Sequence, residues 1–233
     1  MAPRVNSNST TLNYKYLVKG INIKVKKLKL LDDSFLFGSK RYSYDKIIGL
    51  YYKDESATVN FIKSSSVSMK LKLVDGSILS VSAGGIFQKK SMELIRKAYS
   101  ILRQITLNNR FNYYLRQFKR NGFIEYKYFS KMTEAGSWSF IGIPTTVRIY
   151  AQGYIEKNGK RYDLRIAKQS GILEFGSNWS SGLNSSYDPT QIVISEKHIK
   201  LFPAIRTLRI NAVWDTEIIH AIIRALSKGK SLF

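Results

Sequence analysis

The chain has 233 residues, of which 38 are Lys or Arg and 16 are Asp or Glu, so its formal net charge is +22. Hydrophobic residues make up 44% of the chain and only 4 residues are Pro, which excludes a disordered or low-complexity protein and allows a packed core. Because the chain contains no Cys, disulfides, thiolate metal sites and a Cys nucleophile are also excluded.

The excess of basic residues indicates a polyanionic partner. A positive field of this size concentrates nucleic acid, anionic lipid head groups or acidic proteins near the surface. Coding bias is the alternative, since the abundant Lys, Asn, Ile, Tyr and Phe share A/T-rich codons, but it does not explain the small number of carboxylates. Residues 1–120 carry 23 basic and 7 acidic side chains, a net +16, whereas residues 121–233 carry 15 and 9, a net +6. The basic surface is therefore expected mainly in the first half.

The N-terminal residues are polar, and we expect residues 1–20 to form a flexible arm. This stretch lacks the apolar segment of a secretory signal, and no run in the chain approaches the roughly 18 apolar residues that a membrane-spanning helix needs. Together with the absence of Cys, these features favour a cytoplasmic protein, either free or peripheral to a membrane.

The first half is predicted to form several strands. Apolar residues alternate with Lys over 21–30, and the alternation slips by one position between Lys26 and Lys27, which predicts a single strand with a β-bulge. Residues 67–73 alternate strictly, so they predict a half-buried strand, and the Asp-Gly pair at 75–76 predicts a tight hairpin turn to a return strand at 79–81. Further strands are predicted at 35–37, 47–52 and 59–62, with turns at 32–34 and 38–40, and residues 42–44 lead to the strand at 47–52.

The period then becomes helical. Apolar residues recur at helical spacing over 89–106, and a second helical stretch begins at Asn108 and ends before Gly122. The glycine turn at 82–85 connects strand to helix, and its backbone amides offer an alternative use as an anion site.

The second half repeats this order of elements. A closing helix is predicted near 215–228, with Asp215 as its N-cap and Gly229 as its C-terminal stop. Residues 176–190, which are rich in Ser, Asn and Gly, predict a long loop. Strands are predicted at 123–129, 137–143, 146–155, 162–166, 171–176, 191–195 and 206–210.

A short internal repeat occurs in the two halves: the tripeptide Lys-Arg-Tyr follows a predicted turn at 40–42 and again at 160–162. Its matching place in each half favours a duplication. We therefore predict an α+β protein, mostly β, with two small antiparallel barrel or sandwich units, each closed by a C-terminal amphipathic helix. The units are expected at 21–120, which includes a helical extension, and at 121–233.

Catalytic and metal sites are not indicated by the sequence. The two His residues, His198 and His220, have no partner at metal-ligand spacing. The acidic pairs at 32–33 and 54–55 fall in predicted turns rather than in a cleft. No phosphate-binding loop, nucleophile elbow or dinucleotide fingerprint occurs, so we expect no cofactor, no metal and no enzymatic reaction.

Basic residues of the first half form the candidate binding site. Eight of them are predicted to share one face of a sheet: Lys24, Lys26, Lys27, Lys29, Lys40, Arg41, Lys70 and Lys72. Tyr42 and Tyr44 are expected near the rim of this face. A solvated sheet face whose lysines resist edge aggregation is the alternative interpretation. A second basic set lies on the predicted helices, mostly opposite their apolar stripe: Arg96, Lys97, Arg103, Arg110, Arg116, Lys119 and Arg120.

The order of strands and helix in each half resembles that of pleckstrin-homology-like domains. Residues 27–30, 35–37 and 44–50 resemble the opening strands of bacterial members, residues 71–76 their late hairpin, and residues 89–105 their closing helix. Residues 153–155, 159–162 and 215–228 follow a similar order in the second half. The resemblance covers 21–105 and 146–228 and implies tandem domains that bind lipids or proteins. Adjacent bases at 40–41 depart from the Lys/Arg-x-Arg pair of the lipid-binding members, so phosphoinositide specificity is not implied.

The sequence thus predicts a non-catalytic adaptor that docks through its basic face on an anionic surface, such as lipid head groups, or on a partner protein. One alternative is a nucleic-acid-binding protein that uses the same Lys-rich sheet and stacking Tyr residues. An enzyme of unknown type is the remaining alternative.

Overall fold

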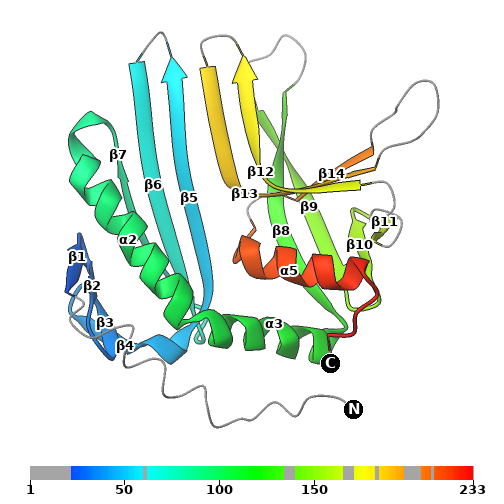
Figure 1. Cartoon of the computed structure of the whole chain (residues 1–233), viewed down its shortest axis with the longest axis horizontal. Coiled ribbons are helices and arrows are strands. Elements are labelled where there is room, and N and C mark those ends of the chain that lie inside the picture. The colour runs from blue at the N-terminus through cyan, green and yellow to red at the C-terminus, as the bar shows by residue number, and fades with distance from the viewer. Residues whose placement is uncertain are drawn as a thin grey trace. The chain divides into compact units, whose positions relative to one another are not determined.

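The computed structural model describes residues 22–59, 62–133, 140–164, 171–181, 184–196, 206–210 and 213–232 (Figure 1). The predicted arm at residues 1–20 lies outside this part of the chain. The described chain is α+β and consists mostly of strands in antiparallel sheets. It divides into two compact units, Met1–Tyr52 with Ser64–Arg110 and Lys53–Lys63 with Phe111–Phe233.

The first unit contains two sheets and a helix. The four-stranded sheet has the order β1-β2-β3-β4: β1 (Ile23–Val25), β2 (Leu28–Leu30), β3 (Ser34–Phe37) and β4 (Lys40–Ser43). A 3-10 turn leads to the three-stranded sheet β5-β6-β7: β5 (Ile47–Val59), β6 (Ile62–Leu73) and β7 (Ile78–Gly84). Of this sheet, the part of β5 after Tyr52 and the part of β6 before Ser64 belong to the second unit. Helix α2 (Lys89–Ile105) then packs against β7 and β1. The predicted strand at 47–52 is therefore part of the longer β5. The strand predicted at 59–62 is not a strand of its own among the described residues, because Val59 ends β5 and Ile62 begins β6.

The predicted bulge between Lys26 and Lys27 is wrong. Val25 pairs with Leu28, so the two lysines form the turn of a hairpin, in which Lys26 has a φ of 52°. Residues directly opposite one another in a hairpin point to the same face of the sheet. A two-residue turn therefore accounts for the slip in alternation as well as a bulge does, and the apolar residues of both strands stay on the buried face.

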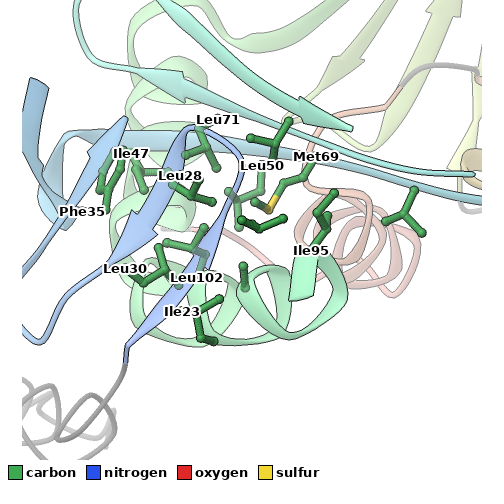
Figure 2. Close-up of a cluster of buried hydrophobic side chains, with 14 of the residues drawn as sticks. Ile23, Leu28, Leu30, Phe35, Ile47, Leu50, Met69, Leu71, Ile95 and Leu102 are labelled. Carbon is green, nitrogen blue, oxygen red and sulfur yellow. The ribbon is translucent and has the colours of Figure 1, made fainter. Parts of the chain in front are cut away.

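The core of the first unit is built by one face of each sheet and one stripe of α2 (Figure 2). Figure 2 shows Leu28 of β2, Leu71 of β6 and Ile95 of α2 in this cluster, and each is at most 2% exposed. The strict alternation predicted for 67–73 is confirmed, since every second side chain from Val67 to Leu73 is buried. The following turn lies where predicted but is longer than a two-residue hairpin, because the ladder closes between residues 72 and 78.

Helix α2 occupies its predicted position, and the second helical stretch is confirmed as α3 (Leu107–Asn121). Thr106 separates the two helices. Arg110 reaches back to this junction, where its Nε donates to Thr106 Oγ1 at 2.9 Å and its Nη2 donates to the carbonyl of Arg103 at 2.6 Å. Because Arg110 is only 1% exposed, it does not belong to the solvent-facing helical basic set that was predicted.

The second unit has the same order of sheets and helix as the first. Its four-stranded sheet has the order β11-β10-β9-β8: β8 (Phe123–Thr133), β9 (Phe140–Tyr150), β10 (Tyr154–Lys157) and β11 (Lys160–Asp163). Its three-stranded sheet has the order β12-β13-β14: β12 (Gly171–Ser181), β13 (Asn184–Glu196) and β14 (Arg206–Ile210). Helix α5 (Thr216–Ser227) comes last (Figure 1). None of the described sheets is a closed barrel.

The loop predicted at 176–190 is wrong, because these residues lie in the two paired strands β12 and β13. Ser177 pairs with Asp188, and the ladder continues to a pair between Ser181 and Asn184. The backbone of every residue type except Pro can join such a ladder, so a Ser-rich and Asn-rich composition does not exclude it. Pro189, which has no N–H, falls where the register shifts.

The boundaries of two other strands also differ from the prediction. Strand β9 runs to Tyr150, and a turn at 151–153 separates it from β10, so the predicted strand at 146–155 is the end of one strand and the start of the next. Gly153 has a φ of 88°, which explains the break, since side chains other than hydrogen are strained there.

The repeated Lys-Arg-Tyr tripeptide occupies equivalent positions in the two four-stranded sheets. Its Lys pairs with the last residue before the turn in both sheets, as Lys40 with Phe37 and as Lys160 with Lys157. In both sheets the Arg pairs with the residue one position before that partner, and the Tyr pairs with the residue two positions before it. The register therefore places both Arg residues on one face and both Tyr residues on the core face, because side chains alternate along a strand.

Asp215 occupies the N-cap position of α5 as predicted, but its side chain makes no capping hydrogen bond. Its Oδ2 accepts a hydrogen bond of 2.8 Å from the hydroxyl of Tyr114, and Asp215 is only 4% exposed. Burial, and then the charge of Asp215, raise the pKa of Tyr114 well above its usual value, so the phenol stays protonated and donates. The bond joins α3 to the start of α5, and Gly229, with a φ of 68°, ends α5 as predicted.

We predict that Leu71→Ala destabilises the first unit by about 2–4 kcal/mol, because it leaves a cavity in a tightly packed core. Lys70→Ala is the control, since Lys70 is the exposed neighbour on the same strand, and it should change the free energy of unfolding by less than about 1 kcal/mol. Urea denaturation followed by circular dichroism measures both. Equal losses would mean that the two faces of β6 are assigned wrongly.

Tyr114→Phe should destabilise the second unit by about 1–3 kcal/mol, because it leaves the buried Asp215 carboxylate without its phenol donor. Tyr113→Phe, at the adjacent and less buried residue, should cost less. The same urea denaturation compares the two variants, and an equally small effect of both would contradict the assigned hydrogen bond.

Candidate functional site

The candidate site centres on the outer face of the four-stranded sheet in the first unit. Lys24 lies opposite Lys29, Lys29 opposite Leu36, and Leu36 opposite Arg41, so these four residues form one row across the sheet. The neighbouring row, which starts at Ile23, contributes to the core. Packing of that core face therefore turns the basic row toward solvent.

Three more basic residues of the predicted site lie at the turns of the same sheet. Lys26 and Lys27 form the β1–β2 turn, and Lys40 follows the β3–β4 turn. The two turns are at the same end of the sheet, because the amide of Gly38 donates to the carbonyl of Lys27 at 2.8 Å. Hydrogen bonds from Ser77 lower the pKa of Asp75, and the charge of Lys40 lowers that pKa further, so the β6–β7 turn is within electrostatic reach of this end.

The basic residues of this site differ in how they are engaged. Lys26 Nζ donates to the carbonyl of Ser82 on β7, and Arg41 forms an exposed ion pair of 3.0 Å with Asp33. Arg41 Nε also donates to Ser34 Oγ at 2.8 Å. In contrast, no carboxylate of the described residues lies within ion-pair distance of the three remaining lysines of the first hairpin: Lys24, Lys27 and Lys29. These three residues are the cations most available to a partner.

The prediction that the eight basic residues share one sheet face, with Tyr42 at its rim, is wrong. Lys70 and Lys72 belong to β6 of the three-stranded sheet, and the Lys70 ammonium lies 5.2 Å from the ring centre of Tyr51. Tyr42 is not on the basic face either, because its ring stacks on Phe35 in the core at a centroid distance of 5.3 Å. The site defined by structure therefore consists of six residues, called here the basic face: Lys24, Lys26, Lys27, Lys29, Lys40 and Arg41.

The second unit carries a charge-balanced row at the position that corresponds to the basic row. Glu125, Arg148, Glu156 and Arg161 lie opposite one another across its four-stranded sheet. Arg148 Nε bonds Glu125 at 2.8 Å, and its Nη1 lies 3.7 Å from Glu156. Acidic partners therefore neutralise basic side chains of this row in the second unit, whereas the lysines of the corresponding row in the first unit stay positive.

An aromatic ladder lies beside this balanced row, and sequence reasoning missed it. The rings of Phe123, Tyr150 and Tyr154 follow one another across three strands at centroid distances of 5.3 and 4.3 Å. Arg161 lies 3.6 Å from the ring centre of Tyr154, and Arg148 lies 5.1 Å from that of Phe123. Ring faces that are covered by other rings and by guanidinium groups are not open for stacking bases. Sequence reasoning missed the ladder because Phe123 is distant in sequence and because residues 146–155, which include Tyr150 and Tyr154, were predicted as one strand rather than two paired strands.

His220 is the one histidine that the described residues include. His198 lies outside the described residues, and His220 is partly buried on α5. Among the residues that the structure describes, no group of three or more His, Asp or Glu side chains is placed to hold a metal ion. No helix in the same residues is sufficiently long and apolar to cross a membrane.

No protein-family model, no curated protein and no solved structure matches this chain.

His220 makes the stability of the second unit dependent on pH. Burial, and then the charge of Arg224, lower its pKa from 6.5 to about 4. The unfolded chain therefore binds a proton that the folded chain resists, so stability is lost as the pH falls from 6.5 toward 4. We predict that His220→Gln loses less stability than the unmodified chain between pH 7 and pH 5, as measured by urea denaturation at both values. The same loss in both proteins would contradict the lowered pKa.

Proposed function

We propose that this protein is a non-catalytic docking protein whose first unit binds anionic lipid surfaces through the basic face. The observation that carries the proposal is the contrast between the two units. Equivalent rows of the two four-stranded sheets hold unneutralised lysines in one case and ion pairs in the other. A solvated sheet face needs polar residues but no charge imbalance, so this excess of one sign favours a role in binding.

We also propose that the two units are related pleckstrin-homology-like domains. Support comes from the shared order of a four-stranded meander, a three-stranded meander and a helix. The equivalent registers of the Lys-Arg-Tyr tripeptides add to it, because unrelated sheets have no reason to share them. Fold alone does not specify a ligand, so the lipid assignment rests on the basic face.

The arrangement of lysines suits a flat, diffusely charged surface better than a deep ligand site. Lys24 and Lys29 stand on adjacent strands, and Lys27 lies in the turn beside them. Each Lys near an anionic membrane contributes about 1 kcal/mol of attraction, which is screened by salt. Several such lysines on one face yield binding that depends on surface charge rather than on head-group identity.

Nucleic acid is the less favoured polyanion. Stacking of bases requires aromatic rings with open faces beside the lysines. Tyr42 instead packs in the core against Phe35, and Tyr44 is buried with its hydroxyl donating to the carbonyl of Leu31 at 2.6 Å. The basic face therefore offers cations without the tyrosine platform that the nucleic-acid interpretation requires.

We predict that changing Lys24, Lys27 and Lys29 together to Gln weakens binding to phosphatidylcholine vesicles that contain phosphatidylserine by on the order of 100-fold, because three attractions are lost. Lys26 is left unchanged, since its ammonium group is already engaged with the carbonyl of Ser82 on β7. Vesicle sedimentation at several salt concentrations measures the affinity, and binding should also fall as salt rises.

The matched control changes three exposed lysines of the second unit to Gln, which alters the net charge equally: Lys160, Lys228 and Lys230. This control should retain most of the binding. Equal weakening in both triple variants would show that only total charge matters, and unaltered binding by the first would show that the basic face is merely solvated. Tighter, salt-dependent binding to single-stranded RNA than to vesicles would favour the nucleic-acid alternative.

A further inference from the structure

Phe87 is an apolar side chain that the fold leaves in water. It is 99% exposed, whereas the other exposed large apolar residues of the described chain are between 37% and 55% exposed. Phe87 lies in the 3-10 turn Ile86–Gln88, in the connection between β7 and α2 (Figure 1). A Phe ring offers one of the largest apolar surfaces of any side chain, so full exposure forgoes stabilisation that burial would supply.

The turn that carries Phe87 is tied to the sheet on one side and to the helix on the other. The amide of Gly85 donates to the carbonyl of Ser65 at 2.9 Å, and Gly85 has a φ of 87°. On the helix side, Met92 is buried in the core within the first turn of α2. Because its flanks are anchored, the ring is held outward. The engaged Gly85 amide also argues against the alternative use of 82–85 as an anion site.

The surroundings of Phe87 along the chain are strongly basic. Lys89 and Lys90 follow it and are exposed. From residue 76 to residue 121, the sequence holds nine basic residues and a single carboxylate, Glu93. An apolar tip next to cations matches the interface of an anionic bilayer, where phosphates meet the acyl chains. An apolar protein groove would cover the ring but would not account for the flanking charges.

We propose that Phe87 is a membrane anchor that inserts into the head-group region of an anionic bilayer, with Lys89 and Lys90 against the lipid phosphates. The proposal rests on the proposed function and adds a second contact to it. Lysines attract the protein over a long range and are weakened by salt, whereas an inserted ring acts only at contact and is insensitive to salt. Two such signals together provide the stable attachment that a single weak one does not.

The absence of Cys makes insertion directly measurable in the full chain. Phe87→Cys and Ile78→Cys each introduce one labelling site for an environment-sensitive fluorophore, with no native thiol to compete. Ile78 is the control because it is 55% exposed and lies at the opposite end of β7. The label at residue 87 should shift to the blue with phosphatidylserine-containing vesicles but not with pure phosphatidylcholine, and the label at residue 78 should stay unchanged.

A second pair of variants tests whether the ring contributes to affinity. Phe87→Ser should weaken binding to phosphatidylserine-containing vesicles by about tenfold, whereas Ile78→Ser should leave it unchanged. Thermal unfolding should be the same for Phe87→Ser and for the unmodified chain, since an exposed ring contributes little to the core.

Three outcomes would overturn the proposal that Phe87 is a membrane anchor, and each can be distinguished from the other two. Unaltered binding by Phe87→Ser with a silent label at residue 87 overturns the anchor alone and leaves the basic face standing. Failure of the unmodified chain to bind anionic vesicles overturns the anchor and the proposed function together. A smaller sedimentation coefficient of Phe87→Ser without vesicles shows that the ring packs on a second copy of the chain, which also overturns the anchor.

Discussion

The packing of one face of the β1–β4 sheet determines what its other face can be. Leu28 and Leu30 on β2 and Phe35 on β3 are completely buried, and the register between the two strands is set by their ladder. A shift of one residue in β2 would turn Leu28 and Leu30 to solvent and carry Lys29 into the core, and the same shift in β1 would carry Lys24 there. Burial of an unpaired charge is far too costly for a marginally stable domain. The outward row of lysines is thus a consequence of the core, and the basic face persists as long as the register does.

The second unit shows that this scaffold does not require a basic face. It keeps the same strand order and the same pairing of its Lys-Arg-Tyr tripeptide, yet its corresponding row alternates Glu and Arg. The core residues and turns specify the fold, while the outward positions are free to vary in charge. The difference between the units therefore lies at the positions that packing leaves unconstrained, which is where a binding specificity can be changed without loss of stability.

Charge and exposed apolar surface would act at different ranges in the proposed membrane docking. The net charge of +22 draws the protein toward an anionic surface over about a Debye length, which is ~8–10 Å at physiological salt. Phe87 contributes only when the turn before α2 meets the bilayer. The hydrogen bond from Gly85 to Ser65 and the buried start of α2 anchor the backbone on both sides of this turn, so little backbone entropy is lost on insertion.

Periodicity within single segments was sufficient to predict the strands at 67–73 and 79–81 and the helices α2, α3 and α5, because the alternation of one face is a local property of the chain. Pairing between segments was not predictable in the same way. The slip at Lys26 fits a bulge and a hairpin turn equally, and only the pair Val25 with Leu28 decides between them. The Ser-rich strands β12 and β13 show no regular alternation of apolar and polar residues over residues 177–188.

Of the predicted site, the lysines of the first hairpin were found from their spacing in the sequence. The separation of Lys70 from these lysines and the core position of Tyr42 were not, because both depend on which strands are neighbours. Composition and local periodicity thus establish the net charge and the apolar faces of these strands and helices. Which charges share a face depends on the tertiary structure, because strand neighbours and registers are set by contacts between residues far apart in the chain.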